Sequence, residues 1–329
     1  MADIQEKAAA DASSTETAPI GFEPYSPPPK SADRQPNAET AAPNQSDELA
    51  PPASAHRIWL CADDYGISNG VNTAIRDLVV RGRINATSVM TVAPACNRAE
   101  ALSLSILNSS TQRVAIGLHL TLTAPFQPIS AGYAPLRNGA FLPLAATLRA
   151  ALLRQLKPEK IAVEIGAQIS AFMKVFDRPP DFVDGHQHVH IFPQVRDAVL
   201  DVVRTSLPDI WVRQCGRRLP MSARLGDRKG LLLDILSATF RKRAGILGVA
   251  VNPAFAGSYD FDSDPDFAAL FPKFLDGLPE NSVVMCHPGF VDDELRRLDP
   301  LTTLREREHA YFTDDAFPKI LSAHGLTLS

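Results

Sequence analysis

The sequence lacks the features that mark a membrane or a secreted protein. No stretch of its 329 residues comes near 18 consecutive apolar side chains, so no membrane span is predicted. The first residues, MADIQEKAAADASS, have neither the basic start nor the apolar run of a secretory signal peptide. We therefore expect a soluble, cytoplasmic protein.

Cysteine is scarce, and neither sign of charge dominates. The four cysteines are far apart and form no CxxC pair, which favours free thiols in a reducing compartment over a disulfide framework. The 33 Lys and Arg residues against 37 Asp and Glu give a net charge of -4, without long runs of one sign. This balance argues against nucleic acid or an anionic membrane surface as the main partner. The sequence indicates no oligomeric state.

Residues 1–55 have few of the side chains that build a core. They contain nine of the 27 prolines, one leucine, and no valine or tryptophan. Such a segment cannot bury enough apolar surface to offset the entropy lost on folding, so we expect a disordered, Pro/Ala-rich tail. An alternative is a docking segment at YSPPPK, which could form a polyproline II helix. The folded domain is expected at residues 56–329.

From residue 57 on, short apolar runs alternate with helical patterns about seven times. The run RIWLCA, for example, precedes NGVNTAIRDLVVRG, whose apolar residues have helical spacing and end at Gly82. Repeated alternation predicts a parallel sheet, and at this length either a (β/α) barrel or a doubly wound sheet.

Polar residues follow most of these apolar runs. In a parallel barrel, functional residues gather at the carboxyl ends of the strands. A site is therefore predicted where these ends meet. The residues concerned are Asp63, Asp64, His119, His186, Arg213, Asn252 and His287.

The adjacent carboxylates Asp63 and Asp64 would repel each other unless a cation lay near them. On a strand they point to opposite sides, so one could bind a cation while the other acts as a base. The alternative is an ordinary turn or N-cap, where Asp is common.

The segment DGHQHVH places three of the eight histidines at alternate positions, His186, His188 and His190. On a strand they would share one face, and neutral imidazole is a favoured ligand for several divalent ions. Three parallel imidazoles cannot all reach one ion, so the remaining rings would support the site or face a substrate. Asp184 could orient a ligand imidazole. The alternatives for this segment are a hydrogen-bonded histidine cluster and a solvent-exposed turn. His119 and His287 could likewise have only structural roles.

These segments together resemble the YdjC-like (ChbG/HpnK) family of carbohydrate deacetylases. The residues that carry the resemblance are ADDYG, NGVNTAI, GRINATSVM, GLHLTLT, DGHQHVHIFP and VMCHPGF, in the family's order and at similar spacing. The resemblance covers the chain from about Arg57 to its C-terminus. Two departures are Gln187, where the family often has histidine, and Tyr65, where it often has phenylalanine.

The resemblance implies a distorted, TIM-like (β/α) barrel and one divalent metal ion, magnesium or zinc. Its ligands would be Asp64, His119 and His186. Asp63 would match the general base, and His287 the imidazole that stabilises or protonates the opposite side of the substrate. The implied reaction removes an N-acetyl group from an N-acetylglucosamine-containing sugar.

Other roles follow from position. Arg213 and His188 are candidates for binding the substrate, with Arg213 alternatively holding Asp63. Aromatic residues that could stack on sugar rings, or simply pack their loops, are Phe126, Tyr133, Phe141, Phe255 and Tyr259.

The alternatives are a non-catalytic carbohydrate-binding protein on the same fold and another single-metal amide hydrolase. Fold alone would not separate a binding protein from an enzyme. The natural acceptor, whether a chitooligosaccharide, a glycolipid or a cell-wall fragment, is not encoded in these motifs.

Overall fold

The computed structural model describes residues 55–108, 113–217, 228–261 and 265–328. Of the predicted tail, residues 1–55, all but Ala55 lie outside the described residues, and so does the segment YSPPPK.

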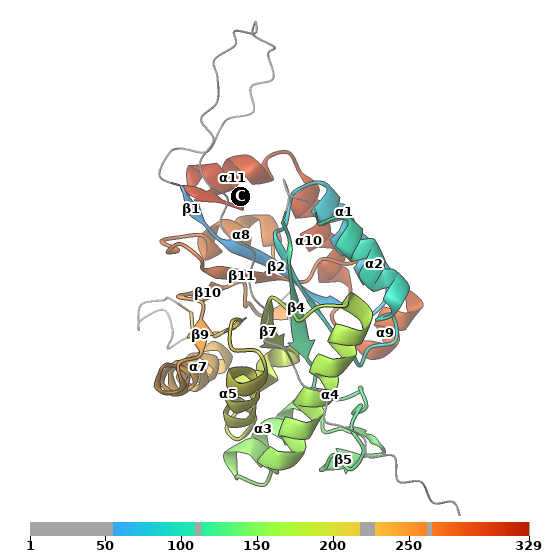
Figure 1. The fold of residues 1–329 in the computed structure, drawn as a ribbon. Coiled ribbons are helices and arrows are strands. Elements are labelled where there is room, and N and C mark those ends of the chain that lie inside the picture. The colour runs from blue at the N-terminus through green and yellow to red at the C-terminus, as the bar shows by residue number, and fades with distance from the viewer. Residues whose placement is uncertain (1–54, 109–112, 218–227, 262–264, 329) are drawn as a thin grey trace, which may run out of the picture. The chain divides into compact units, whose positions relative to one another are not determined.

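The described chain is built on a parallel sheet of eight strands (Figure 1). Its order is β10 (Phe255–Ala256), β11 (Val283–Cys286), β2 (Trp59–Tyr65), β3 (Ala86–Val89), β4 (Ala115–Leu120), β7 (Phe182–Gly185), β8 (Trp211–Val212) and β9 (Ala250–Val251). The sheet curls, but its edge strands β9 and β10 do not pair with each other in the described ranges. The predicted α/β, barrel-like fold is therefore confirmed, as an open form with eight strands where about seven were expected.

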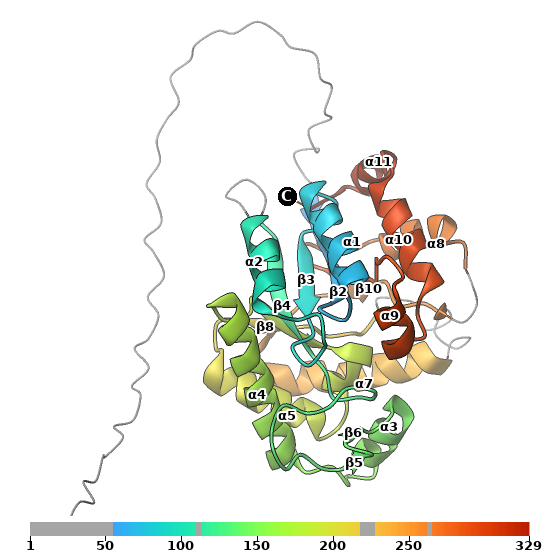
Figure 2. The same cartoon turned by 90° about the vertical axis from the view of Figure 1, so that its right-hand side faces the viewer.

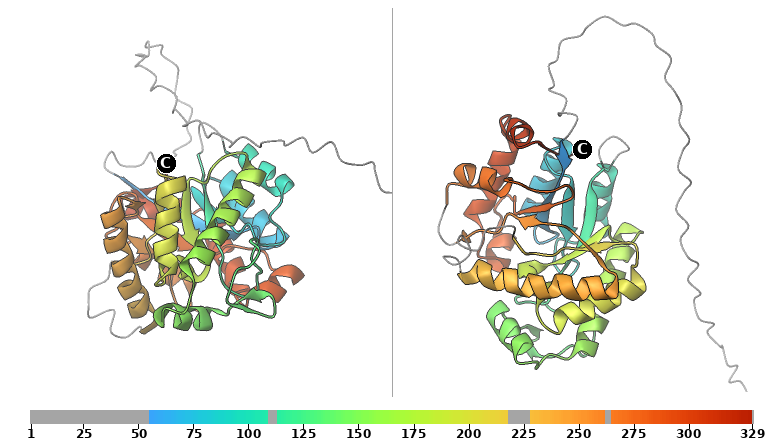
Figure 3. Two further views of the ribbon diagram at one scale, coloured as in Figure 1. Left: turned by 60° about the horizontal axis from the view of Figure 1, so that its bottom comes forward. Right: turned by 90° about the vertical axis from the view of Figure 1, so that its left-hand side faces the viewer.

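Helices surround this sheet (Figure 3). They are α1 (Asn69–Val80), α2 (Arg98–Ile106), α3 (Leu144–Leu152), α4 (Pro158–Phe176), α5 (Val195–Ser206), α7 (Arg228–Leu247), α8 (Phe267–Phe274), α9 (Asp293–Leu298), α10 (Thr303–Thr313) and α11 (Phe317–Ala323). Helices α1 and α10 pack against each other, although more than 200 residues separate them (Figure 2).

Two short pairings lie outside the main sheet. Strand β1 (His56–Arg57) pairs in parallel with β12 (Leu326–Thr327), and β5 (Leu136–Arg137) pairs antiparallel with β6 (Ala140–Phe141). Leu326 and Thr327 thus pair with the first residues of the folded part of the chain.

Helix α1 forms where the apolar spacing predicts it. The side chain of Ser68 caps the helix by accepting a hydrogen bond from the N–H of Val71. The predicted apolar face, which includes Ile75 and Leu78, is buried, and Gly82 follows the helix with a positive φ of 65°.

Two predicted strands are shorter than expected. The apolar run that precedes Asn252, ILGVAV, forms only a short strand, because α7 continues to Leu247 and only Ala250–Val251 pair with β8. The segment after Asp181 leaves the sheet at Gly185 and continues as a 3-10 helix, η1 (His186–Ile191). The expectation that three histidines share one strand face is therefore wrong.

The backbone of η1 explains this difference. Gln187 and His188 both have positive φ, 53° and 58°, so the chain turns away from the sheet directly after His186. Side chains consequently no longer alternate between two faces.

The carboxyl ends of the central strands carry the predicted polar residues to one edge of the sheet. Asp63 and Asp64 lie in β2, and His119 lies near the end of β4. His186 and Arg213 follow β7 and β8 directly. Parallel strands bring these positions together because their carboxyl ends share an edge.

An irregularity in β2 turns both carboxylates into the same buried region. The register of β2 against β3 shifts between Ala62 and Tyr65, and Asp64 has a φ of 70°. This left-handed conformation costs free energy in most residues and is tolerated comparatively well by Asp.

Close packing in the sheet explains the glycine in GLHLTL. A Cβ at Gly117 would lie 2.5 Å from ring atoms of Phe182, and Phe182 stacks on Trp211 with centroids 4.5 Å apart. The ring of Phe182 is held on both sides and cannot move away.

We therefore expect Gly117→Ala to lower the free energy of unfolding by about 1–3 kcal/mol through overpacking. Gly166→Ala in α4 is the matched control, because no atom lies within 4 Å of the added Cβ. Urea unfolding of both variants measures the difference. A Gly117→Ala protein as stable as the control would contradict this account.

Candidate metal centre

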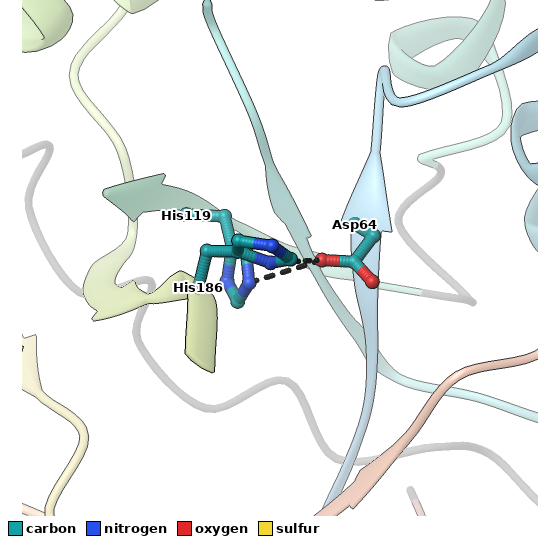
Figure 4. A group of neighbouring side chains, drawn as sticks. All are labelled: Asp64, His119 and His186. Carbon is teal, nitrogen blue, oxygen red and sulfur yellow. Dashed lines mark hydrogen bonds and ion pairs between the residues drawn. The ribbon is translucent and has the colours of Figure 1, made fainter. Parts of the chain in front are cut away.

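Asp64, His119 and His186 form a buried group whose ligand atoms all lie within 4.8 Å of one another. One oxygen of Asp64, Oδ1, lies 3.2 Å from His119 Nε2 and 3.1 Å from His186 Nδ1. Figure 4 shows both imidazole rings directed at this oxygen. An O,N,N donor set of this kind suits a divalent cation with open positions.

The outer nitrogen of His119 is held by a second carboxylate. Asp184 Oδ1 lies 2.7 Å from His119 Nδ1, and Ser88 Oγ lies 2.9 Å from the same nitrogen. A carboxylate on the far side of an imidazole fixes the orientation of the ring and makes it a better ligand. The contact thus has the geometry expected if Asp184 orients an imidazole, and the imidazole is that of His119.

Asp63 faces a different partner from Asp64. The guanidinium of Arg213 binds it with two hydrogen bonds of 2.6 and 2.7 Å, and the same group lies 2.5 Å from Asp184 Oδ2. All three side chains are buried. Of the two roles considered for Arg213, the structure shows the contact with Asp63.

Arg305 on α10 is a member of the site that the sequence motifs do not include. Its Nη2 donates to Asp64 Oδ2 at 2.6 Å and to Asp299 Oδ2 at 2.8 Å. Burial alone would raise the pKa of Asp64. The charges of Arg305 and His186, and hydrogen bonds from both imidazoles, instead hold that pKa well below its ordinary value.

His287 follows β11, and its backbone N–H donates to Glu308 on α10. Glu308 also accepts a hydrogen bond from the hydroxyl of Tyr259. Nδ1 of His287 is buried and has no hydrogen-bond partner among the described residues. Burial lowers the pKa of His287, although Asp64 opposes this effect, and it raises the pKa of Glu308 to about 7.

The remaining two histidines of DGHQHVH lie apart from this group. Nδ1 of His188 lies 3.5 Å from the sulfur of Cys215, and its ring meets Phe255 edge to face. His190 Nε2 donates to the carbonyl of Arg213 at 2.7 Å, so this ring supports the backbone behind the site. Burial lowers the pKa of His190 to about 4. A substrate contact for His188 stays a prediction.

A second group of potential ligands, Cys61, Asp63 and Asp184, also lies within the site. Here the cation is already supplied by Arg213, which contacts both carboxylates. Burial also raises the pKa of the Cys61 thiol well above its ordinary value, so it stays protonated. We therefore do not assign a metal to this group.

The aromatic residues predicted as possible sugar platforms are mostly part of the core. Phe126, Tyr133, Phe141 and Phe255 are at most 7% exposed, which favours the packing alternative. Phe126 meets the ring of His186 edge to face, so it helps to hold that histidine.

Fold and site together define a class of protein: a curled parallel α/β sheet with a buried Asp-His-His group at the carboxyl ends of its strands. Residues 57–323 match the model of the YdjC-like protein family, and the chain belongs to this family.

Two relatives and one solved structure extend the comparison. The chain is 30% identical over 248 residues to a chitooligosaccharide deacetylase of Proteus mirabilis, covering 74% of this chain and 85% of that protein. A chitooligosaccharide deacetylase of Citrobacter koseri is 27% identical over 241 residues, with coverage of 72% and 82%. A crystal structure from Enterococcus faecalis V583, described as a candidate cellobiose-phosphate cleavage protein, superposes with a TM-score of 0.64 at 22% identity. It covers 84% of this chain and 97% of that chain and shows the shared fold. None of the helices in the described ranges has the length and apolar character that crossing a bilayer needs.

Arg305 and Glu308 were missed because TLREREHAYFT reads as a charged, solvated helix. The sequence of this helix shows no pronounced apolar face, and the burial of both residues beside Leu304 and Phe312 is evident only in the structure.

The charges around His119 lead to a prediction for the metal-free protein. Burial alone would lower the pKa of His119, but Asp184, Asp64 and Asp63 raise it to about 10. Because the folded pKa lies above the ordinary value, His119 should stay protonated through pH 8 and lose its proton only as the pH rises toward 10.

Histidine side-chain NMR of the metal-free protein between pH 5 and 10 measures this titration, with His119→Gln to assign the signal. His190 is an internal reference, since its ring should be neutral over the same range. A His119 midpoint below pH 7 would contradict the prediction.

Proposed function

We propose that this protein is a metal-dependent carbohydrate N-deacetylase that removes N-acetyl groups from N-acetylglucosamine-containing oligosaccharides or glycoconjugates. The observation that carries the proposal is the Asp64-His119-His186 group beside a second carboxylate, Asp63, which Arg213 holds apart from it. The activity named for the two relatives supports it.

The site fits one divalent cation by its charge as well as by its donor atoms. Asp63, Asp64, Asp184 and Asp299 are opposed by the guanidinium groups of Arg213 and Arg305. Imidazoles that bind a metal must be neutral, so His119 would release its proton on binding. Four carboxylates against two guanidinium groups then leave two negative charges, which a divalent ion would balance. Asp64, His119 and His186 would hold this ion. Two imidazole ligands favour zinc, cobalt or nickel, and the family resemblance adds magnesium.

When bound, the cation would polarise the amide carbonyl and lower the pKa of a water molecule beside it. Asp63 would accept the proton of this water as it attacks the acetyl carbon, which makes Asp63 the general base. The two hydrogen bonds from Arg213 fix the orientation of Asp63 and keep it from turning toward the cation.

His287 would serve on the other side of the substrate. Its Nδ1 has no hydrogen-bond partner among the described residues, and Glu308 holds its backbone N–H. His287 is therefore the candidate for protonating the departing amine. Its lowered pKa means that the ring is mainly neutral at pH 7 in the free protein. It would take up a proton from solvent as negative charge develops on the substrate and pass it to the amine nitrogen as the C–N bond breaks. The products would be acetate and a free amino sugar.

Asp63→Asn should lower kcat for acetate release from diacetylchitobiose by about 10²–10⁴-fold, because the general base is lost. The variant should still bind the cation, since Asp64 and both imidazoles are unchanged. Acetate release is measured with stripped protein and with each of several divalent ions, and bound metal is measured in parallel.

Asp315→Asn is the matched control, because the Asp315 side chain is fully exposed and pairs with Arg83 and not with a residue of the group. Near-full activity in Asp63→Asn would show that another group is the base. If the metal-bound protein released no acetate from any N-acetylated sugar, the proposed deacetylase activity would be refuted.

Replacing both His119 and His186 by alanine should weaken cation binding by more than about 100-fold, since even outer partners of metal ligands contribute 10- to 100-fold. Isothermal titration with zinc measures the loss. The control is His324→Ala, which removes an imidazole in the last turn before β12. This variant should bind zinc with the affinity of the unchanged protein. Unaltered affinity in the double variant would place the cation elsewhere.

A further inference from the structure

The two oxygens of Asp64 have separate partners. Oδ1 faces both imidazoles, at 3.1 and 3.2 Å, whereas Oδ2 accepts a 2.6 Å hydrogen bond from Arg305. Both Asp64 and Arg305 are almost fully buried, at 1% and 0% exposure, so water does not compete for this contact. A charge-assisted hydrogen bond of this kind is among the stronger polar contacts in proteins.

Arg305 is itself held on three sides. Its Nη2 also donates to Asp299 at 2.8 Å, and its Nε donates to the carbonyl of Leu301 at 3.0 Å. A Cβ at Gly289 would lie 3.2 Å from Cδ of Arg305, so the glycine of the CHPGF segment leaves the room that the side chain occupies. The guanidinium therefore has little freedom to leave Asp64.

We propose that Arg305 is a positioning residue that restricts Asp64 to coordination through one oxygen, and thereby selects small cations, which need only one oxygen of this carboxylate, over Ca²⁺. This inference rests on the metal site of the proposed function. It deepens that function by naming what determines the choice of cation.

The selection follows from how the two kinds of cation bind. Ca²⁺ takes six to eight oxygen ligands and commonly uses both oxygens of a carboxylate. Zn²⁺ takes about four ligands, accepts imidazole nitrogen, and needs only one carboxylate oxygen. Because Arg305 binds Oδ2, Asp64 offers only Oδ1 to a cation, and this suits Zn²⁺ better than Ca²⁺.

The test compares the dissociation constants of Ca²⁺ and Zn²⁺ for the full-length protein and for Arg305→Met. Methionine keeps much of the side-chain volume and removes the donor that binds Oδ2. The ratio Kd(Ca²⁺)/Kd(Zn²⁺), measured by isothermal titration at one pH and salt concentration, should fall at least tenfold. A merely structural ion pair would change stability and leave this ratio as it is.

The matched control is Arg83→Met, which removes another largely buried guanidinium, one that pairs with Asp315 outside the site. It should leave the ratio unchanged. A folded Arg305→Met protein whose ratio stays within about twofold of the original would overturn the proposal.

Removing Arg305 leaves a buried carboxylate less compensated, and such losses can prevent folding. Asp299→Asn then serves instead, because it removes only one of the contacts that fix the guanidinium. The ratio should fall about threefold in this variant, and an unchanged ratio there would count against the proposal in the same way.

The outcomes also separate this inference from the function beneath it. Binding of Zn²⁺ by the unaltered protein, with a ratio that does not respond to Arg305 or Asp299, refutes the selection and leaves the metal site intact. Failure of the unaltered protein to bind any divalent cation refutes the metal site, and the selection falls with it.

Discussion

Neutralising buried carboxylates is the requirement on which this site depends. Asp63, Asp64 and Asp184 are at most 1% exposed, and unpaired charges cannot remain in such surroundings. The guanidinium groups of Arg213 and Arg305 compensate them in part. The charge that remains is what gives the Asp-His-His group its affinity for a divalent cation in the proposed function.

The two arginines divide the carboxylates between two tasks. Arg213 binds both oxygens of Asp63 and also contacts Asp184, so Asp63 is held in one orientation. Arg305 binds only Oδ2 of Asp64 and leaves Oδ1 to the imidazoles. Asp63 and Asp64 are adjacent in β2, yet each has its own set of partners. The left-handed backbone at Asp64 makes this separation possible.

Helix α10 supports the site from outside the sheet. Its buried Arg305 reaches the back of Asp64, and Glu308, one turn later, holds the backbone of His287 and the hydroxyl of Tyr259. The packing of α10 against α1 fixes this helix to the segment that follows Asp64. Because the sheet is curled and open, a helix from the C-terminal part of the chain can pack beside a strand end from its N-terminal part.

Local patterns in the sequence were enough for the alternation of strands and helices, for the apolar face of α1, and for the gathering of Asp64, His119 and His186. They were enough because parallel strands bring their carboxyl ends to one edge whatever the details of packing. The family resemblance supplied roles for these residues that the patterns alone left open. The histidine-rich segment was misjudged beyond His186, since its alternation resembles a strand while the backbone at Gln187 and His188 leaves the sheet.

What only the tertiary structure decided is which buried charges meet. Arg213 and Arg305 lie 150 and 241 residues from the carboxylates that they neutralise. Local periodicity in the sequence cannot predict such a pairing, because the pairing arises from the curl of the sheet and the docking of α10. The sequence by itself determined which strand ends carry carboxylates and imidazoles, since side-chain type and strand direction are local properties. The structure decided which oxygen of Asp64 faces the imidazoles, since that depends on a long-range ion pair.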